Sequence, residues 1–500
     1  MSSSSSQIKK GAAISYLSLA VGIVTSLVYM PWMVGMIGKS NYALYTLASS
    51  FISMFVMDFG LSASVSRFVA KYNAEGRQED IDRLVSTICA LYMVLDCVIL
   101  LVLSTLYFFI DYIYVGLTAE EVYIFRQLYI ISGLYSIVSF PFLPLDGILG
   151  AFELFVQQKS AELLNKLLTV SFVIIALLNG GDVRTLVIAN ALSGLFAIAM
   201  KLFFVKRRAR VYFRPGHFNK RMFIEVAQFS VWATVRSLAY RMTYLLTPSV
   251  LGVVSNSNEI ALFAPANYLE GYFYTISAAI NGLFLATVSR YVASEDEERI
   301  NDLMIRVGRY QFMVMGLVFV GFFCIGRSFL SLWMGREFEG AWRCALLLFV
   351  PDMLIYSEQI ANTTVVVRNK IKKQAIGYVV MAVSCVVLSV PLSSALGAYG
   401  ASLAISVGFM VLFVYMNHIF KHDLNIDVEK FFKECYAKLV PPMILVAIAC
   451  YFITNTIISI PGWLGLLAKG AVVSILYAVT FAFFLNESER GMIKRILPWK

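Results

Sequence analysis

The feature that most constrains this chain is a series of long apolar stretches that recurs from one end to the other. Each stretch has roughly 20 residues, which is enough to cross the hydrocarbon core of a bilayer as a helix. The stretches are continuous apolar runs and lack the alternation typical of barrel strands, so helices are favoured. The connectors between them are too short to fold into a water-soluble domain. We therefore expect fourteen spans, covering residues 11–37, 43–66, 84–110, 123–149, 160–179, 184–205, 223–253, 260–288, 303–326, 343–367, 374–394, 401–420, 437–458 and 463–486.

The charged residues indicate how the spans are oriented. Hydrophobic residues make up 59% of the chain and charged residues 14%, with a net charge of +10. The basic residues gather on alternate connectors, which is typical of the cytoplasmic side of a membrane protein. This predicts a multi-pass protein with both termini in the cytoplasm and does not favour nucleic-acid binding. The cysteines and histidines lack the spacing of metal ligands, so we expect neither a metal site nor a cofactor.

A short repeat predicts the internal organisation. Ser66–Ala70 reads SRFVA and Ser289–Ala293 reads SRYVA, at the same end of spans two and eight. The copies are six spans apart, and because six is even both point the same way across the membrane. This predicts an all-α fold of two six-helix bundles, related by a pseudo-two-fold axis along the membrane normal, plus a terminal helix pair. The corresponding domains are residues 1–222, 223–436 and 437–500.

The first eighty residues carry a family resemblance. Gly38–Tyr45 leads through Met57–Leu61 to Ser66 and Arg67. This pattern resembles the N-terminal signature of bacterial polysaccharide exporters of the O-antigen flippase type. Their superfamily also contains multidrug-and-toxin-extrusion antiporters and lipid II flippases. In span count the resemblance covers the whole chain.

The resemblance implies a function. The expected substrate is an undecaprenyl-diphosphate-linked oligosaccharide, moved from the inner to the outer leaflet of the bacterial cytoplasmic (inner) membrane during O-antigen and lipopolysaccharide assembly. It also implies alternating access through a central cavity and no cofactor. Membrane lipids and other membrane proteins of polysaccharide assembly are the expected partners. Flippases of this type often carry an acidic residue midway along span seven, whereas Arg241–Pro248 contains no carboxylate here.

Charged groups inside spans are costly and are therefore candidates for function. Arg236 and Arg241 lie near the middle of span seven, on either side of Tyr240. Arginine binds phosphate oxygens bidentately and stays charged when buried. We expect these arginines to hold the diphosphate or an acidic sugar; interhelical salt bridges are the alternative. Tyr240 beside them is a further candidate for substrate binding, as are Tyr268 and Tyr272, which share a face of span eight.

The embedded acids are candidates for ion coupling, because a buried carboxylate can carry a proton or bind a sodium ion. They are Asp58, Asp96, Glu270 and Glu358, with Asp352 as a further embedded acid. Pairing with a buried arginine is the alternative role. A coupling carboxylate would also suit a cation-coupled drug antiporter, the second function that we keep open. A membrane polysaccharide ligase or polymerase is the third, but the external connectors are short for a catalytic site, so we expect a transporter and not an enzyme.

Overall fold

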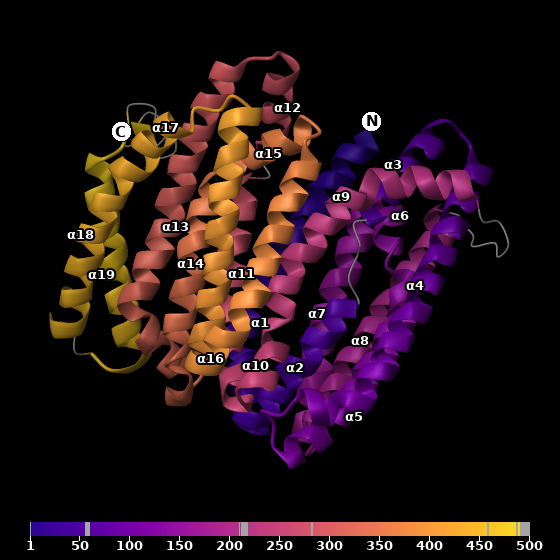
Figure 1. Ribbon diagram of the computed structural model, residues 1–500, viewed down its shortest axis with the longest axis horizontal. Coiled ribbons are helices and arrows are strands. Elements are labelled where there is room, and N and C mark those ends of the chain that lie inside the picture. The colour runs from indigo at the N-terminus through magenta and orange to yellow at the C-terminus, as the bar shows by residue number, and fades with distance from the viewer. Residues whose placement is uncertain are drawn as a thin grey trace. The chain divides into compact units, whose positions relative to one another are not determined.

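The computed structural model describes residues 2–55, 61–209, 211, 219–281, 284–457, 460–486 and 489–490. In this part of the chain every regular element is a helix, which confirms the all-α prediction (Figure 1). By length and hydropathy, eight helices are able to span a membrane, or ten when each of two bent helix pairs counts as one span. The helices follow the fourteen expected segments in order, and several segments are broken into two or three helices. The chain is a multi-pass membrane protein.

The contacts divide the chain into two compact units, and each is described by itself. The first unit holds Met1–Ala261 and the short stretch Ser393–Gly397. Its elements are α1 (Ser2–Ile37), α2 (Lys39–Phe55), α3 (Leu61–Ala74), α4 (Gln78–Ile113), α5 (Ala119–Ser139), η1 (Phe140–Phe142), α6 (Leu145–Ala151), α7 (Phe155–Leu178), α8 (Val183–Phe204), η2 (Val205–Ala209), α9 (Lys220–Leu245) and α10 (Thr247–Val254). Within it α7 packs against α1 and α8, and α9 packs against α2, α3 and α4.

The second unit holds Leu262–Leu392 and Ala398–Lys500. Its elements are α11 (Ser257–Asn281), α12 (Leu285–Ala293), α13 (Glu297–Trp333), η3 (Arg336–Phe338), α14 (Ala341–Ser357), α15 (Gln359–Val367), α16 (Ile371–Asp423), α17 (Val428–Phe431), η4 (Phe432–Ala437), α18 (Lys438–Phe452), η5 (Ile453–Ile457) and α19 (Gly462–Phe483). The long helix α13 packs along α14, α18 and α19 (Figure 1). The domain boundaries after residues 222 and 436 were predicted from the sequence repeat. They stay a prediction.

Two glycines set the bends that apolar runs alone do not reveal. Gly38 has φ +81° and separates α1 from α2, and the helix pair bends there by 118°. Gly397 has φ +58° and kinks α16, which otherwise runs without interruption from Ile371 to Asp423. A positive φ places the backbone where residues with a Cβ are strained, so glycine is the residue suited to each bend.

Several helices begin at side chains that accept hydrogen bonds from the first free amides. Thr118 and Glu121 form a reciprocal capping box at the start of α5. Asp182 caps α8, Asp296 caps α13 and Asp427 caps α17. These caps satisfy amides that have no partner within the helix, and an acid at this end also meets the positive end of the helix dipole.

The predicted repeat is visible as a repeated order of elements. In the first unit a short helix carrying SRFVA, α3, precedes the long α4, and α3 packs against the short α6. In the second unit the short helix carrying SRYVA, α12, precedes the long α13, and α12 packs against the short α15. Both α6 and α15 directly follow a break at the end of a longer helix. The two copies therefore share a construction in which the short helix that carries the repeated sequence packs against another short helix.

The contact between α3 and α6 supports a stability prediction. A Cβ built on Gly147 would lie 2.4 Å from the backbone oxygen of Ser62. The backbone of a packed helix can relieve this clash only by shifting, which costs free energy. Gly147→Ala should therefore destabilise the protein by about 1–3 kcal/mol. Thermal unfolding of the purified protein measures this as a lower melting temperature.

Gly35→Ala is the matched control for that variant. Gly35 also lies within a helix, but a Cβ added there would have no described atom within 4 Å. Alanine has the higher helix propensity, so this change should leave the melting temperature equal or slightly higher. Equal melting temperatures for both variants would contradict a tight α3–α6 contact.

Candidate functional site

The arginines of span seven lie on α9 in the first unit. Arg236 is half-buried, and Arg241 is exposed. The two are five residues apart, which separates them by about 140° around the helix and about 7.5 Å along it. Tyr240 packs edge-on against Tyr244, with ring centroids 5.8 Å apart. The structure therefore brings Tyr240 into an aromatic pair and presents the two arginines on different sides of α9.

Arg241 forms no hydrogen bond or ion pair with any residue that the structure describes. The alternative interpretation of Arg241 as half of an interhelical salt bridge finds no support in this part of the chain. A guanidinium without an ion pair can donate hydrogen bonds to a phosphate or carboxylate ligand without first breaking a contact with a protein group.

Asp96 lies in the middle of α4, the helix against which α9 packs. It is half-buried, and its Oδ1 atom is shielded from solvent without a hydrogen-bond partner among the described residues. Asp58 lies outside the described residues. Of the two candidate acids in the first unit, the structure therefore places one.

Span eight corresponds to α11, whose candidate residues point in two directions. Tyr268 is 46% exposed and Tyr272 is half-buried, whereas Glu270 is only 5% exposed. The two tyrosines share one side of the helix, and Glu270, two residues from each, turns into the interior of the second unit. The sequence grouped these three residues together, but the helix separates the aromatic pair from the acid.

The interior partner of Glu270 is Asp352 on α14. Asp352 is fully buried, and its carboxyl group interacts electrostatically with that of Glu270 and with the Tyr356 side chain. Neither Asp352 oxygen has a hydrogen-bond partner of good geometry among the described residues. Tyr356 in turn packs edge-on against Tyr274. Two buried carboxyl groups in contact repel each other when both are ionised, so a shared proton or a bound monovalent cation would stabilise the pair.

Glu358 has a different environment. It is 1% exposed, and Asn417 on α16 donates to both of its oxygens, at 3.1 and 3.0 Å. The Tyr436 hydroxyl lies 3.4 Å from Glu358 Oε1 and 2.8 Å from the hydroxyl of Ser357. These bonds join the end of α14 to α16 and η4, which is the arrangement of a carboxylate that stabilises packing.

Two charged residues that the sequence patterns did not single out are also prominent in the second unit. Arg309 on α13 is fully buried and forms an ion pair with Glu489, at 2.6 Å between Nε and Oε1. Lys469 is the one charged residue in the apolar helix α19. That isolated charge was a visible signal, whereas the partner of Arg309 is 180 residues away and no local pattern indicates it.

The described residues offer no cluster of three or more metal-ligating side chains. They do enclose an apolar cavity of about 320 Å³ in the first unit, lined by residues of α4, α6 and α8 that include Met93, Leu145 and Leu202. The chemistry of the two units is therefore distinct: α9 of the first presents arginines, and the interior of the second holds a pair of acids.

Comparison of the whole chain with solved structures defines the class of protein to which this fold belongs. The chain is similar to a lipid II flippase, MurJ, in an inward closed conformation, with a TM-score of 0.72 and 14% identity over 95% of this chain and 98% of that one. It is also similar to an inward-facing multidrug resistance MATE family transporter of the MOP superfamily, with a TM-score of 0.66 and 16% identity over 79% of this chain and 97% of that one. The fold is therefore shared with a lipid II flippase and with a transporter of the MOP superfamily, as predicted.

The family follows from the sequence itself. Residues 9–284 match the model of the polysaccharide biosynthesis protein family, and the chain belongs to that family. It is 22% identical to the uncharacterized membrane protein EpsK of Bacillus subtilis (strain 168), over 94% of each chain. The resemblance read from the first eighty residues is thereby confirmed.

Proposed function

We propose that this protein moves an undecaprenyl-diphosphate-linked oligosaccharide from the inner to the outer leaflet of the bacterial cytoplasmic membrane. Membership of the polysaccharide biosynthesis family supports a glycan-bearing substrate. The observation that carries the proposal is the pair Arg236 and Arg241 on α9, of which Arg241 has no protein partner among the described residues. A diphosphate crossing an apolar barrier needs fixed cations, and arginine stays charged in such surroundings.

The proposed mechanism is alternating access, with α9 holding the diphosphate and Tyr240, Tyr268 and Tyr272 available to stack on sugar rings. Both termini are proposed to be cytoplasmic, because the basic connectors lie on their side of the membrane. O-antigen or a related surface polysaccharide is the proposed product class. Other membrane proteins of polysaccharide assembly are proposed partners.

The proposed energy source is an ion gradient acting through Glu270 and Asp352. Their contact inside the second unit supplies a place where a proton or a sodium ion would relieve the repulsion between two carboxylates. The same pair favours one alternative function, that of a cation-coupled drug antiporter, since the fold is shared with a multidrug transporter. The arginines of α9 favour an anionic substrate over a cationic drug.

The test is transport in proteoliposomes loaded with a fluorescently tagged polyprenyl-diphosphate oligosaccharide. Arg236→Ala and Arg241→Ala should each slow the appearance of label in the opposite leaflet about tenfold or more, because a charge-assisted hydrogen bond to phosphate contributes about 1.5–3 kcal/mol. Arg241→Lys should retain part of the rate, since lysine keeps the charge but loses the bidentate geometry.

Arg184→Ala is the matched control, because Arg184 lies near the start of α8 and pairs with its neighbour Asp182. It should transport at the unaltered rate. The proposal fails if the unaltered protein moves no lipid but expels a small cationic dye against a gradient, and the drug-antiporter function then replaces it.

A further inference from the structure

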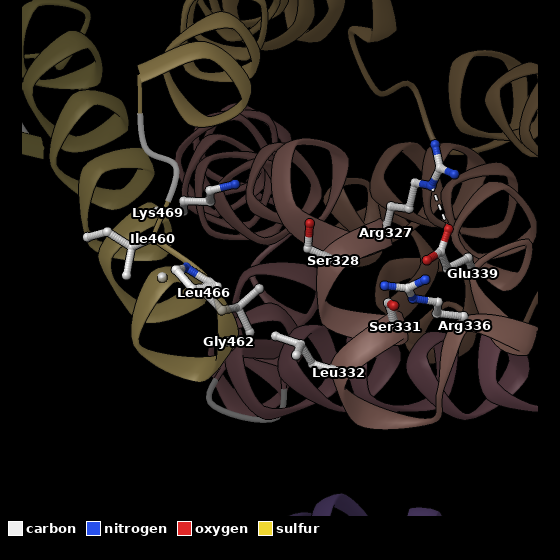
Figure 2. A pocket seen from close by; sticks show the side chains of 12 residues that line it. Arg327, Ser328, Ser331, Leu332, Arg336, Glu339, Ile460, Gly462, Leu466 and Lys469 are labelled. Carbon is white, nitrogen blue, oxygen red and sulfur yellow. Dashed lines mark hydrogen bonds and ion pairs between the residues drawn. The ribbon is translucent and has the colours of Figure 1, made fainter.

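An open pocket of about 640 Å³ lies at the end of the second unit where α13 ends and α19 begins. Its polar wall comes from the last turns of α13 and the following connector, with Arg327, Ser331, Arg336 and Glu339 (Figure 2). Its other wall is α19, from which Lys469 extends towards the α13 side (Figure 2). All lining residues belong to one compact unit, so the pocket is a property of that unit alone.

The pocket contains more positive than negative charge. Arg327, Arg336 and Lys469 line it together with one acid, Glu339. Glu339 pairs with Arg327 at 2.9 Å. Hydrogen bonds from Arg327 and Ser331, together with the charges of Arg327 and Arg336, hold the pKa of the Glu339 carboxyl below its ordinary value, so this one acid stays ionised among three cations. The charges of Arg336 and Lys469 are left in excess.

Lys469 is the unusual member of this set. It is half-buried, it lies seven residues into an otherwise uncharged helix, and it forms no hydrogen bond or ion pair with the described residues. Seven residues correspond to about 10 Å of helix, which places its Cα well below the helix start. A lysine at such a depth is costly unless its ammonium group reaches the membrane surface, where lipid phosphates lie.

The rest of the lining suits a lipid. Ile460 is 54% exposed and Leu332 is 38% exposed, and both border the pocket beside the charged residues. Ser328 adds a hydroxyl donor beside the cations. Cations, hydroxyl groups and an apolar border in one pocket match the polar head and apolar chain of an anionic lipid.

A pocket at the opposite end of α13 also contains cations, but most of them are paired with acids. This second pocket, of about 460 Å³, is lined by four cations. Three of them form ion pairs, namely Arg299 with Asp296, Arg309 with Glu489 and Lys430 with Asp302. The first pocket therefore differs in having two cations without a dedicated acid among the described residues.

We propose that the pocket formed by α13, η3 and α19 binds a phosphate group borne by a lipid. Lys469 and Arg336 bind the phosphate oxygens, the Ser328 hydroxyl donates to them, and the apolar border holds the start of the lipid chain. The phosphate can come from a membrane phospholipid or from a polyprenyl diphosphate, which share this chemistry. The proposal does not depend on transport, because the pocket and α9 lie in different units.

The test is equilibrium binding of fluorescent short-chain phosphatidylglycerol to the purified full-length protein in neutral detergent. Lys469→Gln should weaken binding about fivefold, and Lys469→Gln combined with Arg336→Gln about 25-fold, as expected for roughly 1 kcal/mol per cation. Lys469→Arg should retain binding. Raising the salt concentration should weaken binding to the unaltered protein more than to the double variant.

Arg343→Gln is the control, because Arg343 is an exposed arginine just beyond the same connector that does not line the pocket. It should bind as the unaltered protein does. Thermal unfolding of each variant shows whether it is folded, and Arg336→Gln, at an exposed connector position, keeps the test valid if Lys469→Gln fails to fold. Equal affinities for all variants, or equal affinity for zwitterionic phosphatidylcholine, would overturn the proposal.

Competition distinguishes the sources of the phosphate. Displacement by dioctanoyl phosphatidylglycerol but not by farnesyl diphosphate would support a membrane phospholipid. Displacement by farnesyl diphosphate at lower concentration would support a polyprenyl diphosphate. Displacement by inorganic phosphate as readily as by either lipid would overturn the lipid part of the proposal, because the apolar border would then contribute nothing.

Discussion

Asp352→Asn is expected to abolish ion-driven transport while leaving the protein folded. Asp352 is fully buried against Glu270, and the pair needs a proton or a monovalent cation to relieve its repulsion. Asparagine has nearly the same shape and no charge, so the variant lacks the second carboxylate whose repulsion with Glu270 a shared proton or cation relieves. Transport that depends on a gradient should then fall at least tenfold, to the rate seen without a gradient.

The measurement is substrate translocation in proteoliposomes with an imposed sodium gradient, and separately with an imposed proton gradient. The unaltered protein should respond to one of the two, which identifies the ion. Glu270→Gln should behave as Asp352→Asn does, because either change removes one of the two charges. Asp302→Asn, an exposed acid at the start of α13, is the control and should retain the response.

Glu358→Gln separates coupling from packing. Both Glu358 oxygens already accept hydrogen bonds from Asn417, so this carboxylate is satisfied by the protein. We expect the variant to lower the melting temperature and to keep the gradient response. A lost response in Glu358→Gln with an intact response in Asp352→Asn would show that our proposal assigns the coupling to the wrong acid.

Arg309→Met is expected to cost about 3–5 kcal/mol of stability, the cost of removing one partner of a buried ion pair. Arg309 donates to both oxygens of Glu489, at 2.6 and 3.1 Å. It also donates to the backbone oxygens of Glu434, at 2.5 Å, and Phe484, at 2.9 Å. One guanidinium therefore joins α13 to η4 and to the segment after α19, and its loss leaves a buried carboxylate without compensation.

The double variant Arg309→Met with Glu489→Met should recover a large part of that loss, because an apolar pair of similar volume needs no charge compensation. Thermal unfolding of the purified variants measures both effects. Arg306 is an exposed arginine one turn earlier on α13, and Arg306→Met is the matched control. Its free energy of unfolding should lie within about 0.5 kcal/mol of that of the unaltered protein. Equal melting temperatures for Arg309→Met and Arg306→Met would refute a stabilising role for the ion pair.

The fold was largely predictable because its main signal is local. A continuous apolar run of sufficient length identifies a helix whatever its neighbours are, so the helices follow the expected segments. The SR(F/Y)VA repeat lies on α3 and α12, and the structure adds that these helices pack against α6 and α15, which the sequence did not predict. The bends in the helices were harder to predict from the sequence. Gly38 and Gly397 are two of the 31 glycines of the chain, and nothing in the composition around them specifies a positive φ.

The candidate site was predictable only in part, because its contacts are between distant residues. The cost of a charge in a span made Glu270 a candidate for ion coupling, and that role stays a prediction; its contact with Asp352 depends on how α11 and α14 pack and could not be predicted. Glu358 was a candidate for the same reason, and its contact with Asn417, 59 residues away, could not be predicted from any local pattern. Lys469 was visible as an isolated charge in the last span.

The ion pair of Arg309 also bears on the order in which the chain is made. Glu489 follows Arg309 by 180 residues, so at a synthesis rate of about 5–20 residues per second it arrives roughly 10–40 s later. During that interval α13 holds a cation whose partner does not yet exist, and water or lipid phosphate must solvate it. The pair therefore closes only after Glu489 has been made, and a chain interrupted before Glu489 keeps a guanidinium on α13 without its carboxylate.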